Sequence, residues 1–461
     1  MFPDWGSFSF GNIISKLLLF IFGIIVARVY GVDVYGQYNY AVTVVSYFIM
    51  FAGMGIQSYA VYLISGGPDK LKEYYSKILS INLFFGIVFT ILLLMFVIVI
   101  PTNFIMVIIA GSTILINAFN IDWVFKAKRN FRYISIQIIL IGFIQLLILF
   151  CAYVFNFKNF YIVPVSVSVA QFAGNLFLLF NGHRIFDIRF FYMVSGWSKL
   201  IQNGLPFMFS GIFAGINCNI DIVFLGNLMN DSAVGCYSAA YKLINMLTMI
   251  VSIVFAPIFP EIVESFAKKE LNEISLLVCG VFKSLLILII PAATGGIMIG
   301  DKLLIFLYHI NNSEIKSVFF ILIIYTVIFC IREVYGYLLS ASGNQKKYMG
   351  VTCISAVFNI ILNLVLIPVL GIKGAAFATL FSEFTNLVLM KYFATKIAKI
   401  SFVDLQLGKI CFCTIIMGVC ILFTGYFNLS VISIILISVF VYFLALHIAG
   451  VEVKTLLLRK Q

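Results

Sequence analysis

Long apolar runs separated by short polar stretches repeat along the whole chain. Each run holds about 20 residues, enough for a helix to cross the roughly 30 Å hydrocarbon core of a bilayer. The runs are apolar on all sides and do not alternate with polar positions, which excludes the strands of an outer-membrane barrel. The pattern predicts fourteen transmembrane helices, at 9–29, 39–64, 78–100, 102–122, 133–155, 160–180, 207–228, 237–259, 276–299, 316–339, 349–370, 374–391, 409–427 and 430–449.

The composition supports a membrane protein. Of the 461 residues, 63% are hydrophobic and only 10% are charged, whereas soluble domains average about 25% charged residues. So few charges cannot cover the surface of a soluble fold, which excludes a soluble enzyme, a nucleic-acid-binding domain and a disordered chain. The predicted fold class is therefore all-α, a polytopic membrane protein. The first run leads into a second without a small-residue cleavage site, so we expect no cleavable signal peptide.

The basic residues between the runs predict how the helices are oriented. Loops after even-numbered runs, together with the C-terminal tail, carry 21 of the 30 Lys and Arg residues, and loops after odd-numbered runs carry four. Because Lys and Arg concentrate on the cytoplasmic side of membrane proteins, the even loops and both termini are predicted to be cytoplasmic. The alternation favours an even number of spans, since one miscounted helix would scramble it.

The nine cysteines and three histidines form no recognisable site. Nearly all the cysteines fall inside apolar runs, and no spacing resembles a disulfide framework or a zinc site. We interpret the cysteines as small packing residues, and we predict no metal site and no cofactor. No nucleotide-binding or nucleophile motif is present either, so transport would draw on a proton gradient, a sodium gradient or the membrane potential.

A faint internal repeat divides the chain into two similar parts. Six spans recur in the same orientation, with longer loops in the second copy. Parallel repeats of this kind are typical of transporters. The matching segments are Gly36-x-Tyr38-x-x-Ala41 with Gly235-x-Tyr237-x-x-Ala240, Arg132-Tyr133 with Lys347-Tyr348, and Lys158 with Lys373, the last two pairs sharing an offset of 215 residues.

Short motifs stand at the junctions between runs. They are Ala27-Arg28-Val29-Tyr30-Gly31 with Tyr35-Gly36-Gln37-Tyr38, Asp122-Trp123-Val124-Phe125, Leu205-Pro206-Phe207 with Asp221 and Leu225-Gly226, Val234 to Lys242, and Gly343-Asn344-Gln345-Lys346 with Asn359, Asn363 and Gly371 to Ala376. Their order and placement resemble the Wzx-type oligosaccharide flippases, relatives of MATE multidrug exporters and lipid II flippases in the MOP superfamily. The resemblance covers almost the whole chain. One departure is Ile222 after Asp221, where the family often has a basic residue.

The resemblance implies a MATE-like fold of two pseudo-symmetric six-helix lobes with two further C-terminal helices. It implies an N-lobe at 1–180, a cytoplasmic linker at 181–206, a C-lobe at 207–394, and the last two helices with a cytoplasmic tail at 395–461. The implied function is flipping of undecaprenyl-diphosphate-linked oligosaccharides to the periplasmic leaflet of the bacterial inner membrane by alternating access. The product would be O-antigen lipopolysaccharide, capsule or exopolysaccharide. Implied partners are this cargo, membrane lipid, and a polysaccharide polymerase with chain-length proteins; no nucleic acid is expected.

Ionisable residues inside the spans are the first candidates for the site, because they are costly in a bilayer and usually face an interior cavity. Lys16, Lys283 and Arg332 lie about seven residues, or roughly 10 Å, inside the predicted cytoplasmic ends. We expect these three to hold the diphosphate of the cargo. Arg332 is the strongest candidate, because a guanidinium grips phosphate with two parallel bonds. The alternative for both lysines is snorkelling to the interface.

Three further residues are predicted to line the same cavity. Glu333 or Glu383 would hold Arg332 when no cargo is bound. Arg28 stands at a periplasmic span end, where snorkelling to the interface is the alternative.

A coupling site is predicted at Asp221 and Lys242. The two residues lie at similar depth on consecutive spans joined by a short loop, so antiparallel packing would bring them together. A carboxylate beside a lysine in a membrane can be protonated or paired, which suits coupling to a proton or cation. A purely structural salt bridge fits the same spacing.

Two other functions remain open. A MATE-type drug exporter would have a less cationic cavity with buried carboxylates, and the four basic and three acidic deep residues do not separate it from a flippase. A membrane polysaccharide polymerase, which is an enzyme, needs catalytic residues on sizeable periplasmic loops. The longest such loop, about 300–315, offers only Asp301, Lys302, His309 and Glu314.

The predicted topology can be tested by cysteine labelling in a background without the native cysteines. A cysteine at Asn312 should react with a membrane-impermeant thiol reagent added from outside, and one at Lys347 should react only after permeabilisation. Labelling at Asn312 from the cytoplasmic side alone would overturn the orientation.

Overall fold

The computed structural model describes residues 3–65, 71–98, 104–310, 312–398, 405–427 and 429–451. Within these ranges all regular secondary structure is helical. The helices are α1 (Pro3–Tyr30), α2 (Val32–Ala52), α3 (Ile56–Ser65), α4 (Leu71–Val97), α5 (Phe104–Ala118), α6 (Asp122–Ala127), α7 (Phe131–Val154), α8 (Ile162–Phe186), α9 (Trp197–Leu228), α10 (Asp231–Lys268), α11 (Leu271–Tyr308), α12 (Ser313–Ala341), α13 (Gln345–Leu370), α14 (Ile372–Thr395), α15 (Leu407–Tyr426) and α16 (Val431–Ile448). Lys70, Lys399 and the basic tail residues lie outside the described ranges.

Each of the fourteen predicted spans coincides with a helix or a helix pair. Among the described residues, eleven helices are long and apolar enough to cross a membrane, and the bent pair of α2 and α3 makes a twelfth candidate. The two remaining predicted spans coincide with α5, which has only 15 residues, and with α14, which carries Glu383 and Asn386 near its middle. The all-helical, polytopic fold class is confirmed, and a count of fourteen spans is compatible with these helices.

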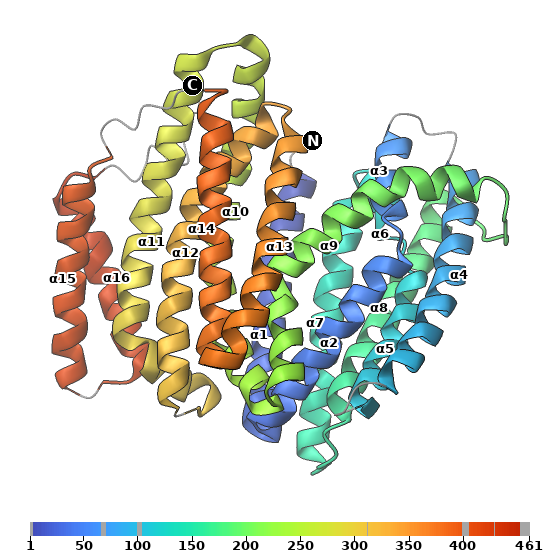
Figure 1. Ribbon diagram of the computed structural model, residues 1–461, viewed down its shortest axis with the longest axis horizontal. Coiled ribbons are helices and arrows are strands. Elements are labelled where there is room, and N and C mark those ends of the chain that lie inside the picture. Colours follow the sequence, from blue (N-terminus) through green and yellow to red (C-terminus); the bar gives the residue numbers. More distant parts are fainter. Residues whose placement is uncertain are drawn as a thin grey trace. The chain divides into compact units, whose positions relative to one another are not determined.

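The chain divides into two compact units, Met1–Gly235 and Cys236–Gln461. In the first unit, α5 packs against α2, α4 and α8, and α7 packs against α1 and α8 (Figure 1). Its core includes the fully buried side chains of Ile78, Trp123 and Phe125. The short helix α6 supplies Trp123 and Phe125 of this core. From the sequence, only the end of a span was expected near Asp122.

The second span is broken, although the sequence predicted one uninterrupted helix at 39–64. Helix α2 ends at Ala52, and α3 continues at an angle of 50°. The turn between them places Met54 and Gly55 at φ 46° and 65°, in the left-handed region. A side chain on Gly55 would overlap the carbonyl oxygen of Gly204 on α9. The glycine therefore permits both the turn and the close approach of α9.

The glycines of the internal repeat pack against each other in the first unit. A Cβ atom on Gly36 would overlap the carbonyl oxygen of Asp231, and one on Gly235 would overlap the carbonyl oxygen of Val32. Beside this contact, the Gln37 Nε2 donates to Asp231 Oδ2 at 3.1 Å. The starts of α2 and α10 thus approach closely because neither repeat motif carries a side chain there.

In the second unit, α12 and α13 pack against α14, and α11 packs against α12. Helices α15 and α16 pack against each other and against α11 (Figure 1). The buried Tyr442 hydroxyl on α16 donates to the carbonyl oxygen of Ile287 on α11 at 2.7 Å. The last two helices therefore attach to one helix of this unit.

Residues 187–196 join α8 to α9 within the segment predicted as the cytoplasmic linker, 181–206. They are non-helical and lie along α4. The Ser76 hydroxyl donates to the Arg189 carbonyl, and the backbone N–H of Met193 donates to the Ser80 hydroxyl at 2.9 Å. Side chains of α4 therefore hold this segment in place.

Adding a methyl group to Gly36 should destabilise the protein, because the close contact with Asp231 must open. We expect Gly36→Ala to cost about 1–3 kcal/mol of unfolding free energy, typical of overpacking. The matched control is Gly211→Ala on α9, where nothing lies within 4 Å of the added carbon and alanine is the better helix former. Thermal unfolding of the two purified variants in detergent measures the difference, and equal melting temperatures would contradict the prediction.

Candidate functional site

Three of the predicted site residues come together inside the second unit. Arg332 and Glu333 lie on α12, and Glu383 lies on α14, which packs along it. Arg332 donates from Nε to Glu383 Oε1 at 2.6 Å and from Nη1 to Glu333 Oε1 at 2.7 Å. The side chains of Arg332, Glu333 and Glu383 are 7%, 16% and 9% exposed. We refer to these three residues as the charge cluster.

In the charge cluster one guanidinium pairs with two carboxyl groups, so acidic groups outnumber basic ones. Burying ions costs several kcal/mol each unless the geometry is good, and both bonds have the short lengths of charge-assisted pairs. The Phe329 ring also lies 4.7 Å from the guanidinium carbon of Arg332. An anionic ligand at Arg332 would therefore have to displace at least one carboxylate.

A ladder of buried polar side chains runs beside the cluster between α13 and α14. The Ser355 hydroxyl donates to the Ser382 carbonyl at 2.9 Å, and the Asn359 amide donates to the Ser382 hydroxyl at 3.0 Å. Asn363 donates to Asn359 Oδ1 at 3.0 Å. Because Ser382 precedes Glu383, this ladder holds the backbone that carries one carboxylate of the cluster.

The remaining predicted site residues are not brought into the cluster. Lys16 and Arg28 are each exposed on α1, and Asp221 is buried on α9, all in the first unit. Lys242 on α10 and Lys283 on α11 are half-buried in the second unit. The Asp221–Lys242 pair joins residues of different units and stays a prediction, as does a shared vestibule for Lys16, Lys283 and Arg332.

A second polar group, in the first unit, was missed by the sequence analysis. It consists of Gln57, Asn82 and Asn117, which line a small pocket at the break between α2 and α3. The signal in the sequence is Gly53-Met54-Gly55 inside an apolar run, where two glycines flank a single residue. In the described part of the chain, no group of three or more His, Cys, Asp or Glu residues is placed to hold a metal ion.

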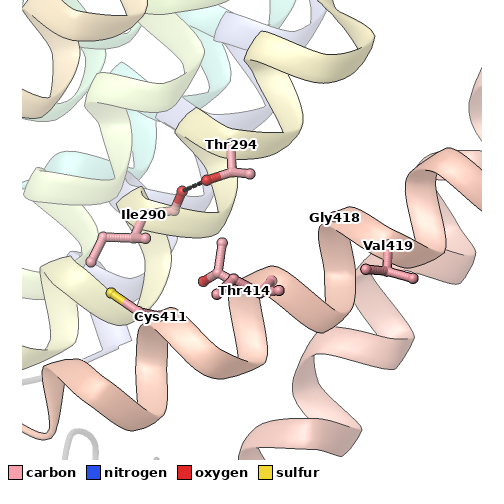
Figure 2. A pocket seen from close by; sticks show the side chains of 7 residues that line it. Ile290, Thr294, Cys411, Thr414, Gly418 and Val419 are labelled. Carbon is pink, nitrogen blue, oxygen red and sulfur yellow. Dashed lines mark hydrogen bonds between the residues drawn. The ribbon is translucent and has the colours of Figure 1, made fainter.

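An apolar groove of about 380 Å³ lies between α11 and α15 (Figure 2). Ile290, Ile415 and Val419 contribute hydrocarbon to its wall. The one hydroxyl on its α11 side, Thr294, donates to the Ile290 carbonyl of its own helix at 3.0 Å. With that hydroxyl already bonded, the groove offers mainly hydrocarbon contacts and suits an acyl or isoprenoid chain better than a polar ligand.

Known proteins resemble this chain in sequence. A family model described as "Polysaccharide biosynthesis protein" matches residues 2–266, more than half of the chain. The probable low-salt glycan biosynthesis flippase Agl15 of Haloferax volcanii is 28% identical over 42% of this chain, and the match covers 41% of its own length. The capsular polysaccharide biosynthesis protein CapF of Staphylococcus aureus is 22% identical over 84% of this chain and 97% of its own. The chain thus matches less than half of Agl15 but nearly all of CapF.

Solved structures show the same fold. The lipid II flippase MurJ in an inward closed conformation has a TM-score of 0.78 at 16% identity, covering 96% of this chain and 98% of MurJ. An inward-facing multidrug resistance MATE family transporter has a TM-score of 0.64 at 12% identity, covering 83% of this chain and 94% of its own. The predicted MATE-like architecture is confirmed.

Removing the guanidinium should destabilise the second unit, because two buried carboxylates then face each other unpaired. We expect Arg332→Ala to cost about 3–5 kcal/mol, as when one partner of a buried ion pair is deleted. The control is Lys316→Ala, which breaks a half-exposed pair with Asp301 at 3.0 Å and should cost less than about 1 kcal/mol. Melting temperatures in detergent report both effects.

The electrostatic part of the stability loss in Arg332→Ala can be separated from the loss of packing by neutralising the two acids. Adding Glu333→Gln and Glu383→Gln to Arg332→Ala should recover part of the lost stability, since no buried charge is left unpaired. If the triple variant melts lower still, the electrostatic account of the cluster is wrong.

Proposed function

Because the chain belongs to the polysaccharide biosynthesis protein family, we propose that it is a flippase for lipid-linked oligosaccharides. It would move the sugar headgroup between the membrane leaflets by alternating access. Two findings on relatives support this assignment: Agl15 and MurJ are both flippases by name, and CapF acts in capsular polysaccharide biosynthesis. The proposal makes the protein a transporter, and the polymerase that the sequence left open would instead be a partner.

The observation that carries the proposal is the buried charge cluster within membrane-spanning helices. A lipid-linked oligosaccharide has a polar, anionic headgroup that cannot cross bare hydrocarbon. Ionisable groups at membrane depth are rare, usually pair with one another or face a cavity, and mark substrate or ion pathways. Arg332 would exchange Glu333 or Glu383 for the phosphates of the cargo, helped by Lys16, Lys283 and Arg28 along the path. The groove between α11 and α15 would receive part of the lipid chain.

The proposal extends to carrier, place and partners. We assign the carrier as undecaprenyl diphosphate and the location as the bacterial cytoplasmic membrane, with both termini in the cytoplasm. The positive loops predict that orientation. Delivered units would pass to a polymerase with its chain-length proteins for O-antigen, capsule or exopolysaccharide. Energy would come from a proton or sodium gradient, with Asp221 and Lys242 as the coupling pair.

Reconstitution tests the activity directly. The purified chain is placed in liposomes that contain a fluorescent undecaprenyl-diphosphate-linked oligosaccharide, and a membrane-impermeant glycosidase is added outside. Liposomes with protein should lose the protected, inner-leaflet fraction of the probe faster than protein-free liposomes. Equal rates in both preparations would overturn the proposal.

The role of Arg332 in this assay is tested with Arg332→Lys. The lysine keeps the positive charge, so stability should fall less than in Arg332→Ala, but it cannot form the planar fork that grips a diphosphate. We expect flipping to slow at least about tenfold, the worth of one charge-assisted hydrogen bond. Lys316→Ala should flip at the wild-type rate. A wild-type rate for Arg332→Lys would remove Arg332 from the binding site.

The coupling role of Asp221 and Lys242 is tested by exchanging them. If they form only a structural salt bridge, Asp221→Lys combined with Lys242→Asp should restore the flipping that each single change abolishes. If Asp221 carries the coupling ion, the exchanged protein should insert and fold but stay inactive. A fully active exchange variant would therefore exclude the coupling role.

A second candidate function is favoured by the net charge of the cluster. With two carboxylates for one guanidinium, the cluster also suits a cationic small molecule, as expected for a drug antiporter. Ethidium efflux from the same liposomes separates the two: export of ethidium without movement of the oligosaccharide probe would favour the antiporter.

A further inference from the structure

The break between α2 and α3 encloses a small polar pocket in the first unit. Ala52 and Gly53 at the end of α2, Gln57 on α3, Asn82 on α4 and Asn117 on α5 line it. Its volume is about 10 Å³, which is room for one water-sized guest. Three amide side chains from three helices thus converge on a space that holds a single small particle.

Asn82 is the unusual member of this group. Its residue is 2% exposed, and in the described part of the chain neither its Oδ1 nor its Nδ2 has a hydrogen-bond partner. An unpaired polar group buried at membrane depth is costly, and such groups are normally satisfied. The side-chain oxygen of Asn117, another amide of the pocket, accepts a long bond of 3.4 Å from the Asn120 side-chain amide. The pocket therefore contains one amide oxygen, that of Asn82, that lacks a protein donor among the described residues.

The helix end at the pocket favours a cation. The lining contains no charged side chain of either sign, and α2 directs its C-terminal end at the pocket, through Ile49, Ala52 and Gly53. The C-terminal end of a helix carries a partial negative charge. Broken transmembrane helices use such ends, with their carbonyl oxygens, to coordinate monovalent ions in transporters. Hard cations prefer the oxygen ligands that amides and carbonyls supply.

We propose that this pocket binds one Na⁺ ion between α2, α4 and α5. The ion would be held by the side-chain oxygens of Gln57, Asn82 and Asn117 and by carbonyl oxygens at the end of α2. Asn82 lies four residues inside one predicted span and Asn117 five residues before the end of another, both from the predicted cytoplasmic side. These distances correspond to roughly 6–8 Å of depth. The ion would therefore exchange with the cytoplasm.

An ion in this pocket would lie at the bend between α2 and α3 and would affect how these helices pack. It would stabilise the bent form of α2 and α3, in which Gly55 packs against α9 at Gly204 and Met208. Binding would thus favour one arrangement of α9 relative to α2 within the first unit. This site is separate from Asp221 and from the charge cluster, and it does not depend on which cargo the protein carries.

Direct binding of ²²Na⁺ to the purified full chain in detergent tests the site. N-methyl-D-glucamine chloride keeps the ionic strength constant, and no cargo is added. The wild-type chain should bind Na⁺ saturably, and Asn82→Leu should bind one ion fewer per chain. The matched control is Gln145→Leu, which removes another buried amide with an unpaired oxygen, on α7 and away from the pocket. It should bind as the wild type does.

A second variant keeps the test decisive if Asn82→Leu fails to fold. Asn82→Asp has almost the same size and adds a negative charge, so Na⁺ should bind about tenfold more tightly or better. An unchanged affinity in Asn82→Asp overturns the proposal. So does the absence of saturable Na⁺ binding in the wild type, or equal stoichiometry in wild type and Asn82→Leu. In those cases the pocket holds only a water molecule.

Discussion

A lipid environment provides no hydrogen-bond partner for a peptide group, and most features of this protein follow from that constraint. Each span must satisfy its backbone internally, which only a helix can do within one segment. Side-chain hydroxyls obey the same rule: Thr326 and Thr414 each donate to the carbonyl four residues earlier. Where a helix breaks, as after Ala52, the turn keeps backbone bonds such as that from the Ile56 N–H to the Gly53 carbonyl at 3.0 Å, while a nearby amide, Asn82, remains unpaired among the described residues at membrane depth. Such places are costly, and their persistence points to function.

Charges follow the same logic at higher cost. The Arg332 guanidinium lies between two carboxylates with bonds of 2.6 and 2.7 Å, so no member of the cluster is left unpaired. The arrangement depends on the guanidinium, because deleting Arg332 would leave two buried carboxyl groups without their shared partner. It is also exchangeable, since an anionic ligand offers the guanidinium the same bonds as a carboxylate. A buried cluster of this kind can therefore bind an anionic ligand even though, without the ligand, its own carboxyl groups occupy the guanidinium.

Small residues decide where helices meet. Gly36 and Gly235 allow the starts of α2 and α10 to touch, and Gly55 allows the turn after α2 to touch α9. Helices in membranes gain little from burying apolar surface against each other, because lipid is equally apolar, so close packing through small residues replaces it. The repeat motifs are thus packing elements first, and their glycines explain why the motif recurs in both halves of the chain.

The sequence by itself determined the fold class, apolar runs that each coincide with a helix or helix pair, and the resemblance to flippases. Bilayer thickness and loop charge act locally on the chain, so runs of residues are sufficient to predict them. It also identified Arg332, Glu333 and Glu383, because a charge inside an apolar run is visible without knowing its neighbours. Tertiary structure alone decided that Glu383, 51 positions from Arg332 in the chain, accepts a hydrogen bond from the Arg332 guanidinium. It also decided that the second span bends and that Asn82 is left without a partner. These features depend on which helix faces which, and that choice rests on contacts between residues far apart in the chain.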